Sequence, residues 1–158
     1  WGKYSSYTTD PNINPHYIRP AMLQQRLQKI MDEYVGGVGT WYMTSKYMLE
    51  EGFFYLDMLK EDSFHMCAED LHELLRAWEN FHRILAGEAH ARHIHFREET
   101  RYPGYYYRGD HLAIDDENWK CFVNSTYDKN TGEWKIFKRD YHQLVADLDQ
   151  TQNKKAAA

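Results

Sequence analysis

The chain has 158 residues, of which 42% are hydrophobic and 27% charged, so its size and composition suit one soluble globular domain. Its formal net charge of −5, with acids interspersed among the bases, argues against a general nucleic-acid partner. No apolar run approaches the roughly 18 residues of a membrane-spanning helix, and no secretory signal opens the chain, so we expect no membrane insertion and a cytoplasmic location.

Residues 1–19 predict an extended lead-in segment without a helix, because turn formers such as Asp10, Pro11, Asn14 and Pro15 interrupt them. The chain opens at Trp1 without a methionine. We therefore expect it to be part of a longer polypeptide.

Residues 20–99 predict an antiparallel three-helix bundle. The first helix begins at Pro20, which suits a first helical turn, and continues to the glycines at 36 and 37. The second runs from about Ser45 to Lys60 and alternates apolar and charged faces. The inward residues expected in these two helices are Leu23, Leu27, Ile30, Met31, Tyr34, Met48, Leu49, Phe53, Leu56 and Leu59.

The third helix is predicted to begin near Ala68 and to reach Glu99, which makes it the longest element of the chain. Apolar residues keep the helical period for about eight turns. The inward residues expected there are Leu71, Leu74, Leu75, Trp78, Phe81, Leu85, Ala89 and Phe96.

Residues 100–148 predict an irregular arm with one short β-hairpin. The stretches "KCFVNSTY" and "EWKIFK" have strand character and flank the turn "DKNTG". Residues 149–158, "DQTQNKKAAA", lack apolar anchors and predict a disordered tail. The expected fold class is mainly α, an antiparallel three-helix bundle followed by an irregular arm with a short β-hairpin.

The glycine-rich turn "VGGVGT" at 35–40 is not a phosphate-binding loop by its position. A dinucleotide fingerprint lies between a strand and the start of a helix, whereas these glycines follow a helix, where a C-terminal cap belongs. Cys67 and Cys121 form neither a C-x-x-C pair nor the four thiolates of an iron-sulfur cluster. The sequence also shows no Ser-His-Asp or Cys-His arrangement for nucleophilic catalysis.

Histidines are plentiful on the third predicted helix, but their spacing does not make a metal site. The pairs Glu69-His72 and Glu79-His82 lie on one helix, roughly 15 Å apart, and cannot share one metal pair. His90 and His93 share a face, but two ligands are fewer than zinc takes from a protein. We expect no catalytic, cofactor-binding or metal-ligating residue in this chain.

Residues 97–119, "REETRYPGYYYRGDHLAIDDENW", combine arginines, carboxylates and aromatic rings around a Pro-Gly break. Charge-assisted pairs with tyrosine and tryptophan are typical of a fixed contact between domains or subunits. The alternative is that Arg101 or Arg108 reaches a bound anion. The candidate contact residues are Arg97, Arg101, Tyr105, Tyr106, Tyr107, Arg108, Asp110, Asp115, Asp116 and Trp119.

These residues carry a resemblance to a known family. Glu-x-Arg at 99–101, Arg-x-Asp at 108–110 and Asp-Asp-Glu-Asn-Trp at 115–119 resemble the C-terminal helical domain of succinate dehydrogenase and fumarate reductase flavoproteins. That family usually has Ser-Arg-Gly-Ala-His before its second arginine, and the stretch 100–107 is longer and lacks the histidine. "FREETRYPGYYYR", "ENWKCFVNSTYD" and "IRPAMLQQRLQKIMDEYVGG" are instead similar to the α subunits of dissimilatory adenylylsulfate reductases, over nearly the whole chain except the tail.

The resemblance implies a C-terminal structural and assembly domain of a flavoenzyme. It implies FAD in an upstream domain of the same subunit and two 4Fe-4S clusters in a partner β subunit. Residues 101–110 would then lock this chain onto either the flavin domain or the partner subunit. Two alternatives stay open: the same domain of a succinate or fumarate flavoprotein, and a free-standing histidine-rich helical binding module.

Overall fold

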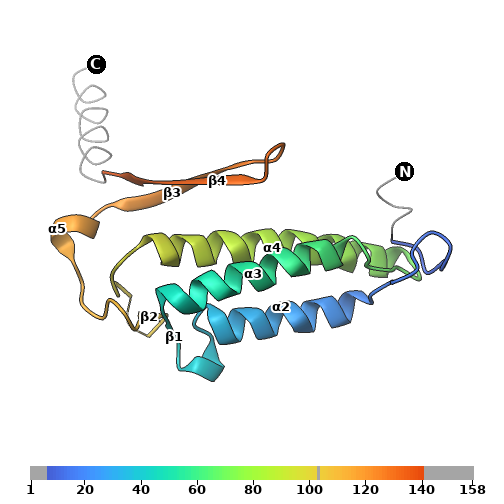
Figure 1. Ribbon diagram of the computed structural model, residues 1–158, viewed down its shortest axis with the longest axis horizontal. Helices are drawn as coiled ribbons and strands as arrows, with labels where there is room; N and C mark the ends of the chain where they lie inside the picture. Colours follow the sequence, from blue (N-terminus) through green and yellow to red (C-terminus); the bar gives the residue numbers. More distant parts are fainter. Residues whose placement is uncertain (1–6, 103, 141–158) are drawn as a thin grey trace, which may run out of the picture.

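A computed structural model of the protein describes residues 7–102 and 104–140. It is mainly α, as expected: three long helices pack side by side, and a two-stranded sheet lies along the outer face of the third (Figure 1). The arm residues 141–148 and the tail 149–158, for which disorder was predicted, lie outside the described residues. The division into four regions stays a prediction.

Helix α2 (Pro20–Tyr34) and helix α3 (Lys46–Ser63) follow the predicted bounds closely. Pro20 occupies the first turn of α2, where its missing N–H costs nothing, and the chain leaves the helix at Gly36 with a φ of +84°. In α3 the Ser45 side chain caps the amide of Met48.

Helix α4 (Leu71–Phe96) is shorter at both ends than the sequence predicts. Asp70 caps it by accepting the Glu73 amide at 2.8 Å, while the amides of Cys67 and Ala68 bond to the lead-in segment instead of entering the helix. The predicted start at Ala68 and end at Glu99 are therefore wrong by three residues each.

The buried face of α4 agrees with the predicted one only in part: Leu74 and Phe81 are half-buried against the core, as expected. Leu71, Leu75 and Trp78 are 83%, 54% and 37% exposed, although their spacing suggested core positions. The residues buried on α4 are Ala77, Asn80, Ile84, Glu88, Ala91 and Ile94. This face is turned by about 100°, one residue, from the predicted stripe, and its small residues allow α2 and α3 to approach closely.

The lead-in segment closes one end of the bundle by backbone pairing. Ile18 forms a parallel bridge with Met66, and the Ala68 amide donates to the carbonyl of Tyr7 at 2.5 Å. Tyr7 is 3% exposed and belongs to the hydrophobic core. No helix occurs between residues 7 and 19, which agrees with the extended segment expected there.

Short elements position the arm at the other end. A 3-10 turn, η1 (Val38–Thr40), precedes strand β1 (Met43–Thr44), which pairs in parallel with β2 (Tyr107–Arg108). Helix α5 (Asp116–Trp119) follows β2. The predicted hairpin is present: β3 (Phe122–Asp128) and β4 (Glu133–Arg139) are antiparallel, and Gly132 takes a φ of +75° in their turn.

Candidate functional site

The candidate site is the arginine clamp, residues 97–119, which leaves the end of α4 and folds back against the start of α3. Arg108 is its largest fully buried side chain, with 0% exposure. Its Nη1 donates to three carbonyl oxygens at the end of α4, those of Ile94 at 2.6 Å, His95 at 3.1 Å and Arg97 at 2.8 Å. These carbonyls have no partner inside the helix, so the guanidinium satisfies them and also meets the negative end of the helix dipole.

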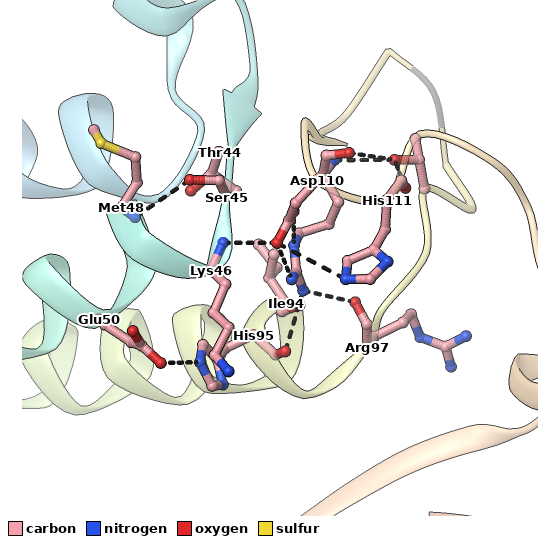
Figure 2. Close-up of polar contacts among 12 residues, drawn as sticks. Thr44, Ser45, Lys46, Met48, Glu50, Ile94, His95, Arg97, Asp110 and His111 are labelled. Carbon is pink, nitrogen blue, oxygen red and sulfur yellow. Dashed lines mark hydrogen bonds and ion pairs between the residues drawn. The ribbon is translucent and has the colours of Figure 1, made fainter.

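Asp110 holds the other side of the same guanidinium. Its two carboxylate oxygens accept Nε and Nη2 of Arg108, each at 2.9 Å, and Oδ2 also accepts the backbone amide of Lys46 at 2.9 Å. Figure 2 shows Asp110 between Lys46 at the start of α3 and the carbonyl groups at the end of α4. The Arg108 hydrogen bond therefore holds the pKa of Asp110 well below its usual range.

Glu99, unlike Asp110, is a fully buried carboxylate with 0% exposure, and it is the shared acceptor of two arginines. Arg97 and Arg101 both donate to its Oε1, Arg101 also donates to Oε2 at 2.9 Å, and the Asp115 amide donates at 3.0 Å. Burial alone would raise the pKa of Glu99, but the hydrogen bonds bring it below its usual value. Arg101 reaches further, to Asp116 at 2.9 Å.

Trp119 fixes the far end of the clamp to α4. It is 7% exposed and packs edge-on against Phe96, with ring centroids 5.7 Å apart. Arg97 donates to the Trp119 carbonyl at 2.9 Å and to that of Cys121 at 2.7 Å, and Lys138 of β4 lies 3.5 Å from the indole ring centroid. Trp119 and Arg97 thereby help to attach the hairpin to the bundle.

The tyrosines of the clamp have separate positions. Tyr106 is half-buried against the core, and burial raises its pKa. Tyr107 belongs to β2, where its amide donates to the Tyr42 carbonyl at 2.6 Å. Tyr105 is 81% exposed and joins no part of the network described above.

A cleft of about 420 Å³ lies beside the clamp, between the last turns of α4 and the start of β3. His90, Tyr102, Trp119 and Phe122 are among the residues that line it. Burial, and to a smaller degree His93, lowers the pKa of His90, which favours a neutral imidazole. Among residues 7–102 and 104–140, no three His, Cys, Asp or Glu side chains are grouped so as to hold a metal ion.

Most of the predicted contact residues therefore lie together, but they bind one another. The nitrogens of the Arg108 guanidinium all donate within the chain, so the alternative of an anion on Arg108 is not supported. Glu99 is one of the carboxylates that the sequence places opposite the arginines, but it was not among the candidate contact residues and its burial was not predicted. The signal was its spacing: residues 97, 99 and 101 alternate, and alternate residues of an extended segment point to the same side.

Within the part of the chain that the structure describes, no helix has the length and apolar character to cross a bilayer. No protein-family model matches the chain. Over 138 residues it is 56% identical to subunit alpha of the adenylylsulfate reductase of Megalodesulfovibrio gigas, a match that covers 87% of this chain and 21% of that subunit.

Solved structures agree with that match. The adenylylsulfate reductase of the hyperthermophile Archaeoglobus fulgidus gives a TM-score of 0.79 at 51% identity, over 87% of this chain and 22% of that one. The quinol fumarate reductase of E. coli gives 0.67 at 19% identity over 78% of this chain and 21% of that one, which shows a shared fold alone. The predicted resemblance is confirmed, and the chain spans about a fifth of the length of the relatives that it matches.

Proposed function

We propose that this chain is the C-terminal structural and assembly domain of the α subunit of an adenylylsulfate reductase, an FAD-dependent oxidoreductase. The complete enzyme would convert adenylylsulfate and two electrons to sulfite and AMP, or run the reverse reaction. The observation that carries this proposal is the 56% identity over 138 residues to an adenylylsulfate reductase α subunit. The chemistry would belong to parts of the subunit outside this chain.

The glycine-rich turn of this chain does not fit the phosphates of FAD. Gly37 and Gly39 follow α2 and enclose Asp32: a Cβ added at either glycine would lie 2.3 or 2.4 Å from an oxygen of that carboxylate. The Gly39 amide donates to Asp32 at 2.9 Å, so the turn is a helix cap filled by a carboxylate, and a phosphate there would meet like charge. We derive no flavin step from these residues.

The residues do not fit an iron-sulfur cluster either. Cys67 is buried at the lead-in end and Cys121 is half-buried at the clamp, and a cluster takes four thiolates. On the strength of the sequence resemblance, we propose two 4Fe-4S clusters in a partner β subunit of an αβ heterodimer and FAD in the upstream domain of the same subunit as this chain. The cytoplasmic location stays a prediction.

The role proposed for the clamp is to make a rigid body for assembly. Its charged groups bind one another and close the end of the bundle. The exposed rings of Tyr102 and Tyr105 are then available to contact the flavin domain or the partner subunit. A clamp that is satisfied internally presents a fixed surface, and a fixed surface loses less conformational entropy on docking.

The test is to express the complete gene that contains this sequence, with its partner subunit, and to assay the purified complex. We expect flavin absorbance and reduction of adenylylsulfate, measured as AMP release. Turnover of fumarate in place of adenylylsulfate would favour the succinate and fumarate alternative, for which 19% identity supports the fold alone. Stoichiometric metal uptake that His90→Ala and His93→Ala abolish would favour the histidine-rich module.

A further inference from the structure

An apolar turn between α2 and α3 is a feature that the clamp does not account for. From Tyr34 to Ser45 the chain reads YVGGVGTWYMTS, with no charged residue, although 27% of the chain is charged. We call residues 38–43 the tryptophan turn. In Figure 1 it extends away from the bundle at the end of α2, on the side opposite to the hairpin.

The turn exposes large apolar side chains. Val38, Trp41 and Met43 are 70%, 84% and 49% exposed, and Tyr47 in the first turn of α3 is 68% exposed. Tyr42 is 39% exposed as well. One exposed apolar side chain is ordinary on a protein surface, but five within ten consecutive residues make an apolar patch. Such patches mark interaction sites.

The backbone holds this turn in an unfavourable conformation. Trp41 and Tyr42 have φ angles of +55° and +61°, in the left-handed region that non-glycine residues rarely occupy, at a cost of about 1–3 kcal/mol each. The Gly37 carbonyl accepts the amides of Thr40 at 3.2 Å and Tyr42 at 2.9 Å. The chain therefore spends stability to keep the indole outside the bundle.

The turn is also attached to the clamp. The Tyr42 carbonyl accepts the Tyr107 amide at 2.6 Å, and the Thr44 hydroxyl donates to the Tyr34 carbonyl at 2.7 Å. A rigid exposed tryptophan loses little entropy on binding, and tryptophan is among the residues that contribute most to interface affinity. The geometry is that of a preformed anchor.

We propose that the tryptophan turn docks this chain onto the remaining polypeptide of its own α subunit, with Trp41 seated in an apolar pocket there. The relatives that match this chain are about five times longer, so about four fifths of such a subunit lies outside the chain. This inference rests on the proposed function.

The composition of the turn is typical of a permanent interface. Permanent interfaces resemble a divided core and are depleted in charged residues at their centre, whereas contacts between proteins that associate and separate carry more polar groups. The 12 uncharged residues from 34 to 45 fit a permanent contact. The large share of the subunit outside this chain is the reason to choose its own polypeptide as the occupant. A separate subunit is the alternative occupant that the experiment must exclude.

The first test is hydroxyl-radical labelling with mass spectrometry on the complete α subunit, alone and with its partner subunit, with the urea-unfolded subunit as reference. We expect labelling of Trp41 to be slower by about tenfold in both folded samples, as for a side chain buried in an interface. Protection in the complex alone would assign the turn to the partner subunit and overturn the proposal. Labelling at the unfolded rate in both samples would show a free surface and overturn it equally.

The second test compares Trp41→Ala with Phe54→Ala, a matched loss of an exposed ring on α3, where Phe54 is 59% exposed. Because Trp41 is 84% exposed, its loss leaves the bundle core intact. In the complete subunit, hydrogen exchange of residues 34–47 should increase about 30-fold for Trp41→Ala and stay unchanged for Phe54→Ala. Equal increases in both variants, or none in either, would overturn the proposal.

Activity toward adenylylsulfate is measured on the same preparations. Protection of Trp41 in a subunit that does not reduce adenylylsulfate would refute the proposed function and leave the docking inference standing. An active subunit in which Trp41 is freely labelled would support the proposed function and refute the docking inference.

Discussion

The two ends of the helix bundle are closed by different chemistry. At the clamp end, two of the buried groups are ionised: Arg108 and Glu99 are both 0% exposed and are paired with opposite charges. At the lead-in end, the lead-in segment buries a neutral amide, Asn14, which is 3% exposed. Its Nδ2 lies 3.1 Å from the carbonyl of Thr8 and 3.2 Å from that of Met66.

The two ends therefore depend differently on pH and on the presence of each partner. A neutral amide keeps its hydrogen bonds at every pH, and its loss costs the hydrogen bonds of one group. An ionised pair is stable only while both partners are present and charged, because one unpaired buried charge costs much more than the pair contributes. The clamp end is therefore the sensitive end, and the four predictions below compare it with the lead-in end.

Removal of the central arginine should have the largest effect. Arg108→Met removes the donor to three carbonyls at the end of α4 and the charged partner of Asp110, which keeps the Lys46 amide. We therefore expect the free energy of unfolding to fall by about 3–5 kcal/mol. Urea unfolding of the chain followed by circular dichroism measures it. The double variant Arg108→Met, Asp110→Asn should recover part of the loss, because it removes the stranded charge. A loss below about 1 kcal/mol would contradict a central role for Arg108.

The matched change at the lead-in end should cost less. Asn14→Ala leaves the carbonyls of Thr8, His65 and Met66 without this donor, so the free energy of unfolding should fall by about 1–3 kcal/mol. Asn12→Ala, in the exposed turn of the same segment, is the control and should change it by less than about 0.5 kcal/mol. If Asn14→Ala cost more than Arg108→Met, the two ends would have been ranked in the wrong order.

The helices could be predicted from sequence because their signals are local. Pro20, Ser45 and the glycine at 36 mark helix ends through φ preference and capping, which depend on neighbouring residues alone. The buried face of α4 was predicted only in part because Asn80 and Glu88 are polar, and a hydrophobic pattern assigns polar residues to the surface.

Those polar residues are buried because of partners on other helices. The Asn80 amide donates to the Pro20 carbonyl at 2.7 Å, and Glu88 pairs with Lys60 of α3. Likewise, β1 and β2 have two residues each and pair across about 64 positions, so no local pattern predicts them. Sequence identified which residue types meet at the clamp, and the fold determined that they bind one another.

Low pH should weaken the clamp end and not the lead-in end. The folded-state pKa values of Glu99 and Asp110 lie below the ordinary 4.5 and 3.8, so in this range the unfolded chain takes up protons first. Their contribution to stability is present above these values and is lost as the pH falls through the lower folded-state values. We expect the free energy of unfolding to fall less steeply in Asp110→Asn than in the unaltered chain between about pH 5 and pH 3. Asn14→Ala should keep the slope of the unaltered chain, and a parallel curve for Asp110→Asn would contradict the assignment.

The smallest effects should come from ion pairs on the surface, and they should be small at both ends. Arg19 and Glu69 meet at 2.6 Å at the lead-in end with 55% and 51% of their side chains exposed, and Asp116, 63% exposed, meets Arg101 at 2.9 Å at the clamp end. Because water and salt screen such pairs, Arg19→Gln and Asp116→Asn should each lower the free energy of unfolding by less than about 1 kcal/mol. Urea midpoints at low and at high salt measure both. If Asp116→Asn alone cost more than about 2 kcal/mol, charge at the clamp end would matter wherever it lies, and burial would not be what distinguishes the two ends.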